Sequence, residues 1–486
     1  MSNLVKSFLQ DSAFYTITSF ISKITNVLLL PFYLQLLSKE NFGLYDYLIV
    51  SLTILTIIFT LQIDQAFGRY YSSTGNSLKK KSIYTTGLIY YVIIFLIISV
   101  SVWLNSEFIA STLFNNAEYS NRSIQFISPY ILFNHILIYN LSAFRWSAKS
   151  KLYSIIVSSM AILQAVIIIY FLLNGYAVLS IFIGLSVVSV FFAIITLFLL
   201  RDNFRIKTFS LFILKRLMQF GLPLVPAAVS IYFLQYVDRY MIVNMLGLES
   251  LGLYSVGIRI STVIMLVFSG FQMAWGPFIF ANYKNPAIHL ILTKTFVTLM
   301  ISTLLLTVSF TLFSPELLFL IANPVYENAY IYVPYLMFTS FLFLISGYFS
   351  IGFSIAKNNW PKVYINVTAF ILNIVLNYIL ISYLQIEGAA ASTLISIIFL
   401  TVVSLQWSCK FYPMQFQLKK LIPLISMSLA IIIVSRLYFN SQVSGLIILY
   451  KMSCIVVLLL LIYFSRLVSL KNLKEILKKE PNTQLS

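Results

Sequence analysis

A lysine and an arginine lie inside runs of apolar residues, where charged side chains are rare. Lys23 stands in FISKITN, about 12 residues into one apolar run, and Arg259 stands in VGIRIST, within a second run. A charge near the middle of a membrane span costs at least about 2.5 kcal/mol on insertion scales, so such residues usually face a water-filled cavity or a partner. We therefore expect Lys23 and Arg259 to line a cavity.

The residues around Lys23 indicate what such a cavity would hold. Thr16, Ser19, Lys23 and Asn26 follow one another at spacings of three or four, so they form one polar stripe on a helix. Two bases in a low-dielectric site with few buried acids favour an anion, and phosphate or pyrophosphate is the obvious candidate. The predicted anion site therefore consists of Lys23 and Arg259, with Asn26 beside Lys23.

Four further charged residues are candidates for binding, coupling or gating. Asp238 and Arg239 are adjacent in one apolar run, and Asp64 and Arg69 lie near the end of another. Arg239 is a further substrate-binding candidate, whereas Asp238, Asp64 and Arg69 are candidates for coupling or gating. Two alternatives stay open, an ion pair to a neighbouring helix for Asp238 and Arg239, and a helix-end ion pair for Asp64 and Arg69.

The elements that position these residues are predicted to be membrane helices. The chain has 486 residues, of which 60% are hydrophobic and 9% charged. Lipid admits only helices or closed barrels, and the apolar runs do not alternate as barrel strands would. An all-α polytopic membrane protein with about fourteen spans follows, at 12–37, 42–64, 83–104, 124–144, 152–173, 177–200, 217–245, 250–275, 291–313, 329–353, 361–383, 388–409, 421–439 and 446–465.

The basic residues predict the orientation of these spans. Lysines and arginines concentrate in alternate loops and in the C-terminal tail, while the other loops carry mostly glutamates. The positive-inside rule then places both termini in the cytoplasm, in a plasma (cell inner) membrane. The formal net charge of +18 sits in short loops rather than on one soluble face, so nucleic acid is not an expected partner.

The loops are too short for a catalytic domain. The longest is about 20 residues, and no phosphate-binding GxxxxGK[ST] motif or nucleophile–base arrangement is present. His135 and His289 are the only histidines and lack the spacing of metal ligands. We expect no enzyme, no cofactor and no metal.

Two segments share Glu, two residues, then Gly-Leu-Tyr. They are Glu40 to Tyr45 in KENFGLY and Glu249 to Tyr254 in LESLGLY, and each opens an apolar span. A second, weaker similarity between the two halves aligns Gly175 with Gly388. Spans one to six would then correspond to spans seven to twelve in a parallel repeat, with a substrate cavity between two halves.

The order of several motifs resembles a known family. LLPFYLQLLSKENFGLYDY, LQIDQAFGRYYSS, the Leu-Pro-x-x-Pro segment leading into Asp238 and Arg239, QMAWGPFIF and LQIEGAAAST occur in this order. The chain thereby resembles the polysaccharide exporters, the O-antigen and capsule flippases of the multidrug/oligosaccharidyl-lipid/polysaccharide superfamily. The resemblance implies two six-helix lobes around a central cavity plus two C-terminal helices, so we expect an N-lobe at 1–205, a C-lobe at 206–415, two further helices at 416–466 and a basic tail at 467–486.

The resemblance also implies a transport activity. A flippase of this kind carries an undecaprenyl-pyrophosphate-linked oligosaccharide from the cytoplasmic to the outer leaflet by alternating access, and its partners would be that glycan lipid, the bilayer and the polysaccharide polymerase machinery. A lipid II flippase and a cation-coupled multidrug exporter of the same fold are alternatives. Lys23 disfavours the drug exporter, which should carry an acid in the first span. A membrane glycan polymerase is disfavoured by the missing loop domain.

Overall fold

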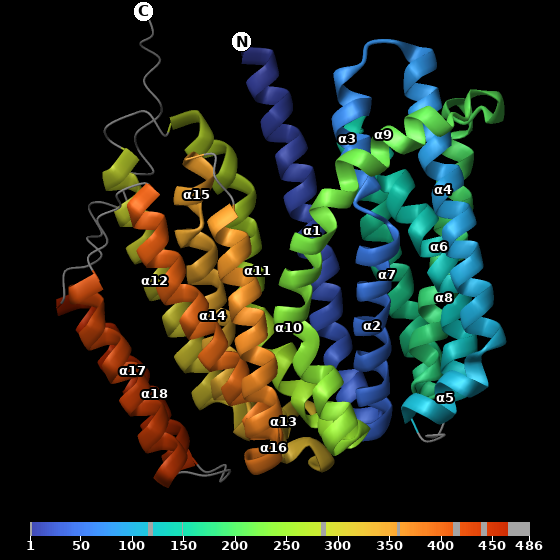
Figure 1. Cartoon of the computed structure of the whole chain (residues 1–486). Coiled ribbons are helices and arrows are strands. Elements are labelled where there is room, and N and C mark those ends of the chain that lie inside the picture. Colours follow the sequence, from blue (N-terminus) through green and yellow to red (C-terminus); the bar gives the residue numbers. More distant parts are fainter. Residues whose placement is uncertain are drawn as a thin grey trace, which may run out of the picture. The chain divides into compact units, whose positions relative to one another are not determined.

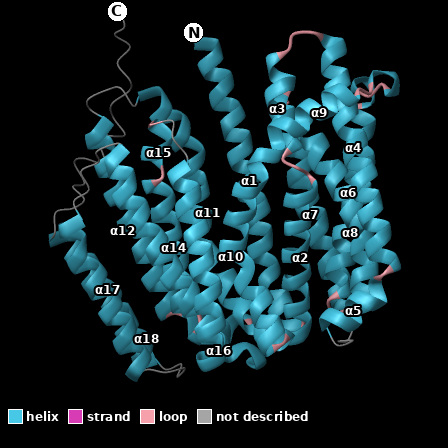
Figure 2. Ribbon diagram, viewed as in Figure 1, coloured by secondary structure: helices cyan, strands magenta, loops and turns pink. Residues whose placement is uncertain are grey.

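The computed structural model describes residues 2–114, 120–147, 149–282, 288–356, 360–411, 418–438 and 445–464. In these ranges all regular structure is helical, and Figure 2 shows no strand among them. Figure 1 labels the α-helices along the chain. Their bounds are α1 Ser2–Leu36, α2 Lys39–Phe59, α3 Ile63–Ser73, α4 Ser77–Leu104, α5 Ser106–Phe114, α6 Ser120–Trp146, α7 Ser150–Leu173, α8 Leu179–Leu199, η1 Arg201–Asn203, η2 Ile206–Thr208, α9 Leu211–Gly221, η3 Leu222–Leu224, α10 Val225–Leu246, α11 Leu248–Asn282, α12 Ile288–Leu312, α13 Ser314–Ile321, η4 Pro324–Ile331, α14 Val333–Phe349, α15 Ile351–Ile355, α16 Trp360–Phe411, α17 Leu418–Tyr438 and α18 Gly445–Phe464.

These helices make the chain an all-α polytopic membrane protein. Ten described helices are long and apolar enough to cross a bilayer, or eleven if the bent pair Leu211–Leu224 and Ala228–Leu246 is one span with a 51° bend. Each of the fourteen predicted spans overlaps a helix, but α6 and α17 are not among the ten, and α17 has only the shorter apolar stretch Leu421–Arg436. The count of fourteen stays a prediction.

The long helix α16 contains a chain reversal. Gln385 has φ 52° and ψ −129°, which is not helical. The Ser392 hydroxyl donates to Oδ1 of Asn377 at 2.5 Å, and Nδ2 of Asn373 lies 3.3 Å from Oγ1 of Thr393. Fifteen residues of straight helix would separate Ser392 from Asn377 by about 22 Å. The two arms of α16 therefore fold back on one another, as expected for two consecutive spans.

The chain forms two compact units. Unit 1 comprises residues 1–259, 321–326 and 366–393, and unit 2 comprises 260–320, 327–365 and 394–486. Within unit 1, α6 packs on α4 and α8, and α7 packs on α8 and α1 (Figure 1). Within unit 2, α12 packs on α14, α17 and α18. The predicted lobe boundaries at 205/206 and 415/416 stay predictions.

The two Gly-Leu-Tyr motifs contact one another inside unit 1. A Cβ atom on Gly43 of α2 would collide with the carbonyl oxygen of Leu248, and a Cβ atom on Gly252 of α11 would collide with the carbonyl oxygen of Lys39. Lys39 and Leu248 each precede the glutamate of their own motif, so the contact is reciprocal. Reciprocal contacts of this kind arise between elements related by a two-fold axis.

A repeated tyrosine hydrogen bond supports the same relation. The Tyr139 hydroxyl lies 3.3 Å from the carbonyl oxygen of Ile83 in unit 1, and the Tyr348 hydroxyl donates to the carbonyl oxygen of Leu292 at 2.7 Å in unit 2. Both members of the second pair follow those of the first by 209 positions, which is also the separation of Gly43 and Gly252. Each half of the chain thus contains the same tertiary contact.

Candidate functional site

Asp46 lies at the centre of a buried charge cluster in unit 1. It follows the Gly-Leu-Tyr motif on α2 and is 4% exposed. Its Oδ2 accepts a hydrogen bond from Nε of Arg239 at 2.8 Å, and its Oδ1 accepts one from Nη2 of Arg259 at 3.2 Å. One carboxylate on α2 therefore holds two arginines, from α10 and α11.

Arg239 is fixed by a second carboxylate as well. Its Nη1 lies 3.4 Å from Oδ1 of Asp238 and donates to the carbonyl oxygen of Gln235 at 2.9 Å. The other oxygen of Asp238 accepts a hydrogen bond from the hydroxyl of Tyr254, which belongs to the second Gly-Leu-Tyr motif. A buried charge is stable only when it is paired and hydrogen-bonded, and Arg239 satisfies both conditions.

Gly247 sets the geometry between these partners. It ends α10 with φ 86°, in the region that glycine adopts without a Cβ penalty, and its N–H donates to the carbonyl oxygens of Ile242 and Val243. Helix α11 starts at Leu248, directly after this glycine. The short connection brings Asp238, on α10, within reach of Tyr254, on α11.

Arg259 is the partly exposed member of the cluster. Its side chain is 31% exposed, whereas that of Arg239 is 6% exposed. Its guanidinium carbon also lies 5.3 Å from the ring centroid of Tyr45, a distance typical of a cation–π contact. The guanidinium thus reaches Asp46 and Tyr45 while part of the side chain stays exposed. Arg259 is therefore the cluster residue best placed to meet a ligand.

The other two residues of the predicted anion site lie on α1. The side chain of Lys23 is partly exposed, and that of Asn26, about one turn further on, is exposed. The structure thus brings Arg239, Arg259 and Asp238 together around Asp46, while Lys23 and Asn26 lie on a separate helix. The substrate-binding roles of all these residues stay predictions.

Asp64 and Arg69 both lie on α3, five residues apart, and therefore do not face the same way. Arg69 is exposed and its guanidinium carbon lies 4.9 Å from the ring centroid of Phe220. No ion pair joins Asp64 to Arg69, although both belong to the described part of the chain. The alternative of an ion pair between Asp64 and Arg69 at the helix end is therefore wrong. Their role in gating stays a prediction.

His135 is a packed residue of unit 1. It is 2% exposed, and its ring stacks on Phe95 with centroids 3.6 Å apart. Its Nε2 lies 2.8 Å from Oγ1 of Thr56, and its Nδ1 lies 2.5 Å from the carbonyl oxygen of Ile131. Both ring nitrogens are thus engaged within the protein. Within the described residues no group of three or more His, Cys, Asp or Glu side chains could hold a metal ion.

The sequence did not predict the balance of charge at the site. We expected few buried acids, but Asp46 and Asp238 are 4% and 3% exposed and pair with two arginines. Asp46 was recognisable only as one of several polar residues on α2, because its partner Arg239 lies 193 positions away. The cluster therefore has two bases and two acids. Its ion pairs join α2 to α10 and α11, and its charges are balanced rather than purely basic.

The fold and this buried cluster define a class, an all-helical polytopic membrane protein with an ion-pair cluster inside it. A lipid II flippase MurJ in an inward closed conformation aligns with 96% of the chain and 99% of its own length, with a TM-score of 0.71 and 15% identity. An inward-facing multidrug resistance MATE family transporter of the MOP superfamily aligns with 81% of the chain and 94% of its own, with a TM-score of 0.63 and 14% identity. These likenesses show the fold.

The family follows from the sequence comparison. Residues 8–283 match the model of the polysaccharide biosynthesis protein family, and the chain belongs to that family. Residues 223–379 also match the MatE model. An Lsg locus protein of Haemophilus influenzae (strain ATCC 51907 / DSM 11121 / KW20 / Rd) is 26% identical over 286 residues, which cover 57% of this chain and 67% of the relative.

Proposed function

We propose that this protein is a flippase that moves an undecaprenyl-pyrophosphate-linked oligosaccharide, an O-antigen or capsule repeat unit, from the cytoplasmic to the outer leaflet. One observation carries the proposal: the segment that matches the polysaccharide biosynthesis family, residues 8–283, contains Lys23, Asp46, Arg239 and Arg259. A transporter of polysaccharide synthesis needs a site for an anionic lipid-linked glycan, and this segment holds three bases that lie inside helices. The protein itself makes and breaks no bond of the glycan.

Lys23 and Arg259 are the proposed pyrophosphate ligands. Both side chains are partly exposed, so a ligand can reach them without unfolding a helix. A guanidinium binds phosphate oxygens through two parallel hydrogen bonds, and an ammonium binds them as a point charge. Asn26 would donate to sugar or phosphate oxygens, and the lipid tail would remain in the bilayer.

Asp46 is the proposed gate. It joins α2, from the predicted N-lobe, to α10 and α11, from the predicted C-lobe, next to the close contact of Gly43 and Gly252. Alternating access requires contacts that exist in one state and break in the other. A pyrophosphate bound by Arg259 would compete with Asp46 for the same guanidinium, which would couple substrate binding to release of this gate.

Asp64, Arg69 and Asp238 complete the proposed mechanism as coupling or gating residues. Asp238 is the favoured one, because its carboxylate bonds to both Arg239 and Tyr254, so a change in its charge would alter the whole cluster. The protein would act in the plasma membrane with both termini in the cytoplasm. Its exported glycan would supply the polysaccharide polymerase machinery.

Lipid II transport is the second candidate function. The alignment with a lipid II flippase extends over 96% of the chain, and lipid II also carries a pyrophosphate. A multidrug exporter is the third candidate, on the MATE-type fold and the MatE match at 223–379. The basic residues Lys23 and Arg259 favour the two anionic substrates over a cationic drug.

Reconstitution separates these substrates. The purified full-length chain would be placed in liposomes with a fluorescent lipid-linked O-unit, with fluorescent lipid II, or with a cationic dye inside, and movement followed by quencher or dye release. We expect transport of the lipid-linked O-unit that fails in Arg259→Ala. Transport of lipid II alone would replace the proposal with the second candidate, and dye movement alone with the third.

A further inference from the structure

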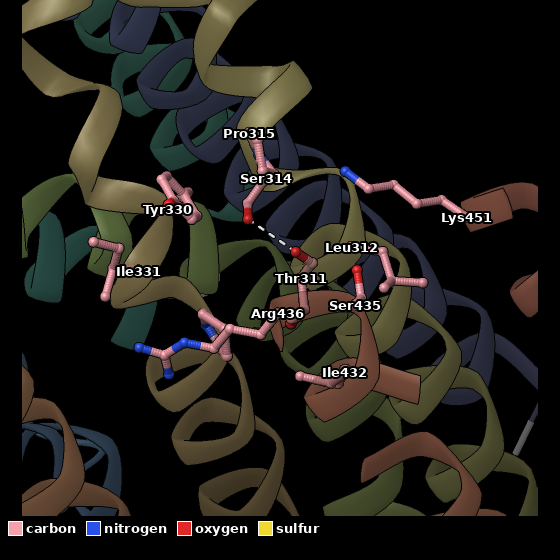
Figure 3. A pocket seen from close by; sticks show the side chains of 11 residues that line it. Thr311, Leu312, Ser314, Pro315, Tyr330, Ile331, Ile432, Ser435, Arg436 and Lys451 are labelled. Carbon is pink, nitrogen blue, oxygen red and sulfur yellow. Dashed lines mark hydrogen bonds between the residues drawn. The ribbon is translucent and has the colours of Figure 1, made fainter. Parts of the chain in front are cut away.

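A further feature that could bind a ligand lies in unit 2, where α17 and α18 meet α12, α13 and α14. A small, partly open pocket lies there, lined by residues of all five helices. Figure 3 shows its lining, with Arg436 and Lys451 on opposite sides and Thr311 and Ser314 between them. The lining residues are Thr311, Leu312, Ser314, Pro315, Tyr330, Ile331, Pro334, Ile432, Ser435, Arg436 and Lys451.

The lining is rich in donors and contains no acid among these described residues. Two bases, Arg436 and Lys451, face four hydroxyl groups, those of Thr311, Ser314, Tyr330 and Ser435. Sugar sites typically add carboxylates or amides as acceptors, and this lining lacks both. Hydroxyls and bases together are the groups that bind phosphate oxygens. The composition therefore favours an anion.

Both bases are held in place by neighbours. Nζ of Lys451 lies 2.6 Å from Oε1 of Glu316, and Lys451 is 1% exposed. Nη1 of Arg436 lies 3.2 Å from the hydroxyl of Tyr335, and its guanidinium carbon lies 5.4 Å from the centroid of that ring. Glu316 pairs with Lys451 and offsets its charge. Arg436 is thus the residue expected to dominate anion binding.

One polar atom of the lining is unsatisfied in the structure. The Thr311 hydroxyl oxygen is buried and has no hydrogen-bond partner among the described residues, and the residue as a whole is 7% exposed. A buried hydroxyl without a partner is costly, so such groups usually mark a bound water, ion or ligand. Thr311 lies between the two bases, where a ligand oxygen would satisfy it.

We propose that this pocket binds the phosphate of an anionic membrane lipid. Arg436 lies two residues before the end of α17, and Lys451 is in the second turn of α18, so both are near the same end of this helix pair. Lys451 is about 9 Å from the start of its helix, a depth close to the lipid headgroups. Ile433, which precedes Arg436 by one turn, is 56% exposed, so an acyl chain can follow α17 away from the pocket.

This inference goes beyond the proposed function and does not depend on it. Helices α17 and α18 begin after residue 379, where the last family match ends, so neither match assigns them a role. The pocket also lies wholly in unit 2, whereas the charge cluster lies wholly in unit 1. Lipid binding and glycan transport can therefore be measured and can fail separately.

Native mass spectrometry of the purified full-length chain tests the inference. The probes are dioleoyl phosphatidylglycerol, undecaprenyl monophosphate, dioleoylglycerol as the lipid without phosphate, and inorganic phosphate as the ion without lipid. The variants are Arg436→Ala, Arg436→Lys and Thr311→Val. Arg201→Ala is the matched control, because Arg201 is an exposed arginine that stacks on Phe198 in unit 1.

We expect one lipid with a phosphate to bind, about tenfold more weakly in Arg436→Ala and several-fold more weakly in Thr311→Val, with the Arg201→Ala control unchanged. Arg436→Lys should retain part of the affinity, which would show that Arg436→Ala acts through charge rather than through misfolding. Phosphatidylglycerol and undecaprenyl monophosphate are measured separately. The one that binds with the higher affinity identifies the lipid class that the pocket prefers. Equal binding of dioleoylglycerol, equal affinity in Arg436→Ala, or binding of inorganic phosphate with no binding of either lipid would overturn the inference.

Discussion

Gly43 and Gly252 pack against one another's helices through the same surface. Each glycine faces the carbonyl oxygen of the residue that precedes the other motif, Leu248 for Gly43 and Lys39 for Gly252. Only a residue without a Cβ fits at either position. The contact lies one turn from Asp46, so the packing of the two glycines sets the distance at which Asp46 meets Arg239 and Arg259.

Gly43→Ala tests this dependence. The new methyl group would meet backbone atoms, including the backbone nitrogen of Gly252 at 3.0 Å, and backbone cannot move aside as a side chain can. Overpacking of this kind costs about 1–3 kcal/mol. We expect a lower melting temperature and loss of export in cells. Gly75→Ala is the control, because nothing lies within 4 Å of its Cβ position, and an equal fall in both variants would contradict the close contact.

Asp46 should couple more strongly to Arg239 than to Arg259. The pair with Arg239 is shorter, at 2.8 Å against 3.2 Å, and its arginine is 6% rather than 31% exposed. Removing one partner of a buried ion pair costs about 3–5 kcal/mol because the other charge is left uncompensated. Double-mutant cycles with Asp46→Asn, Arg239→Gln and Arg259→Gln, followed by thermal unfolding in detergent, measure both couplings. A larger coupling to Arg259 would contradict the geometry.

The repeated tyrosines give an internal comparison. Tyr348→Phe should destabilise the protein more than Tyr139→Phe, because the Tyr348 bond to Leu292 is 2.7 Å long, whereas Tyr139 lies 3.3 Å and 3.2 Å from two carbonyl oxygens. A lost hydrogen bond costs about 0.5–1.5 kcal/mol. Melting temperatures of both variants and of the double variant decide the order, and the reverse order would contradict the structure.

The buried pair of Lys451 and Glu316 should behave as a unit. Either Lys451→Met or Glu316→Gln alone leaves one buried group without its partner, which we expect to lower stability by about 3–5 kcal/mol. The double variant removes both charges and should recover most of the loss. Thermal unfolding of the three variants measures this recovery, and simple addition of the two losses would show that the ion pair is not formed.

The helices were predictable because each apolar run is long and lacks the alternation of strands. The short helices α3, α5 and α13 were not predicted, because they are 11, 9 and 8 residues long and lie where loops were expected. The break between α2 and α3 could not be predicted from the sequence either, because Leu61 and Gln62 adopt positive φ although neither is a glycine. Such local strain depends on tertiary packing rather than on residue type.

The candidate site was predictable only in part. Charge in an apolar run is visible in the sequence, so Lys23, Arg239, Arg259 and Asp238 could be chosen as candidates. The partners were not visible, because Asp46 is 213 positions from Arg259, and nothing in the local pattern links them. The repeated Gly-Leu-Tyr motif was the one sequence pattern that marked this region, because both copies lie at the close contact of α2 and α11 beside Asp46.

We propose that the protein exports a lipid-linked glycan through a site containing Lys23 and Arg259. The most direct measurement is complementation of a strain that lacks its own O-unit flippase, scored as surface polysaccharide, with protein levels matched by immunoblot. We expect the unchanged chain to restore the polysaccharide and the Lys23→Ala and Arg259→Ala variants to leave it absent. Export by both variants at the level of the unchanged chain would contradict the anion site.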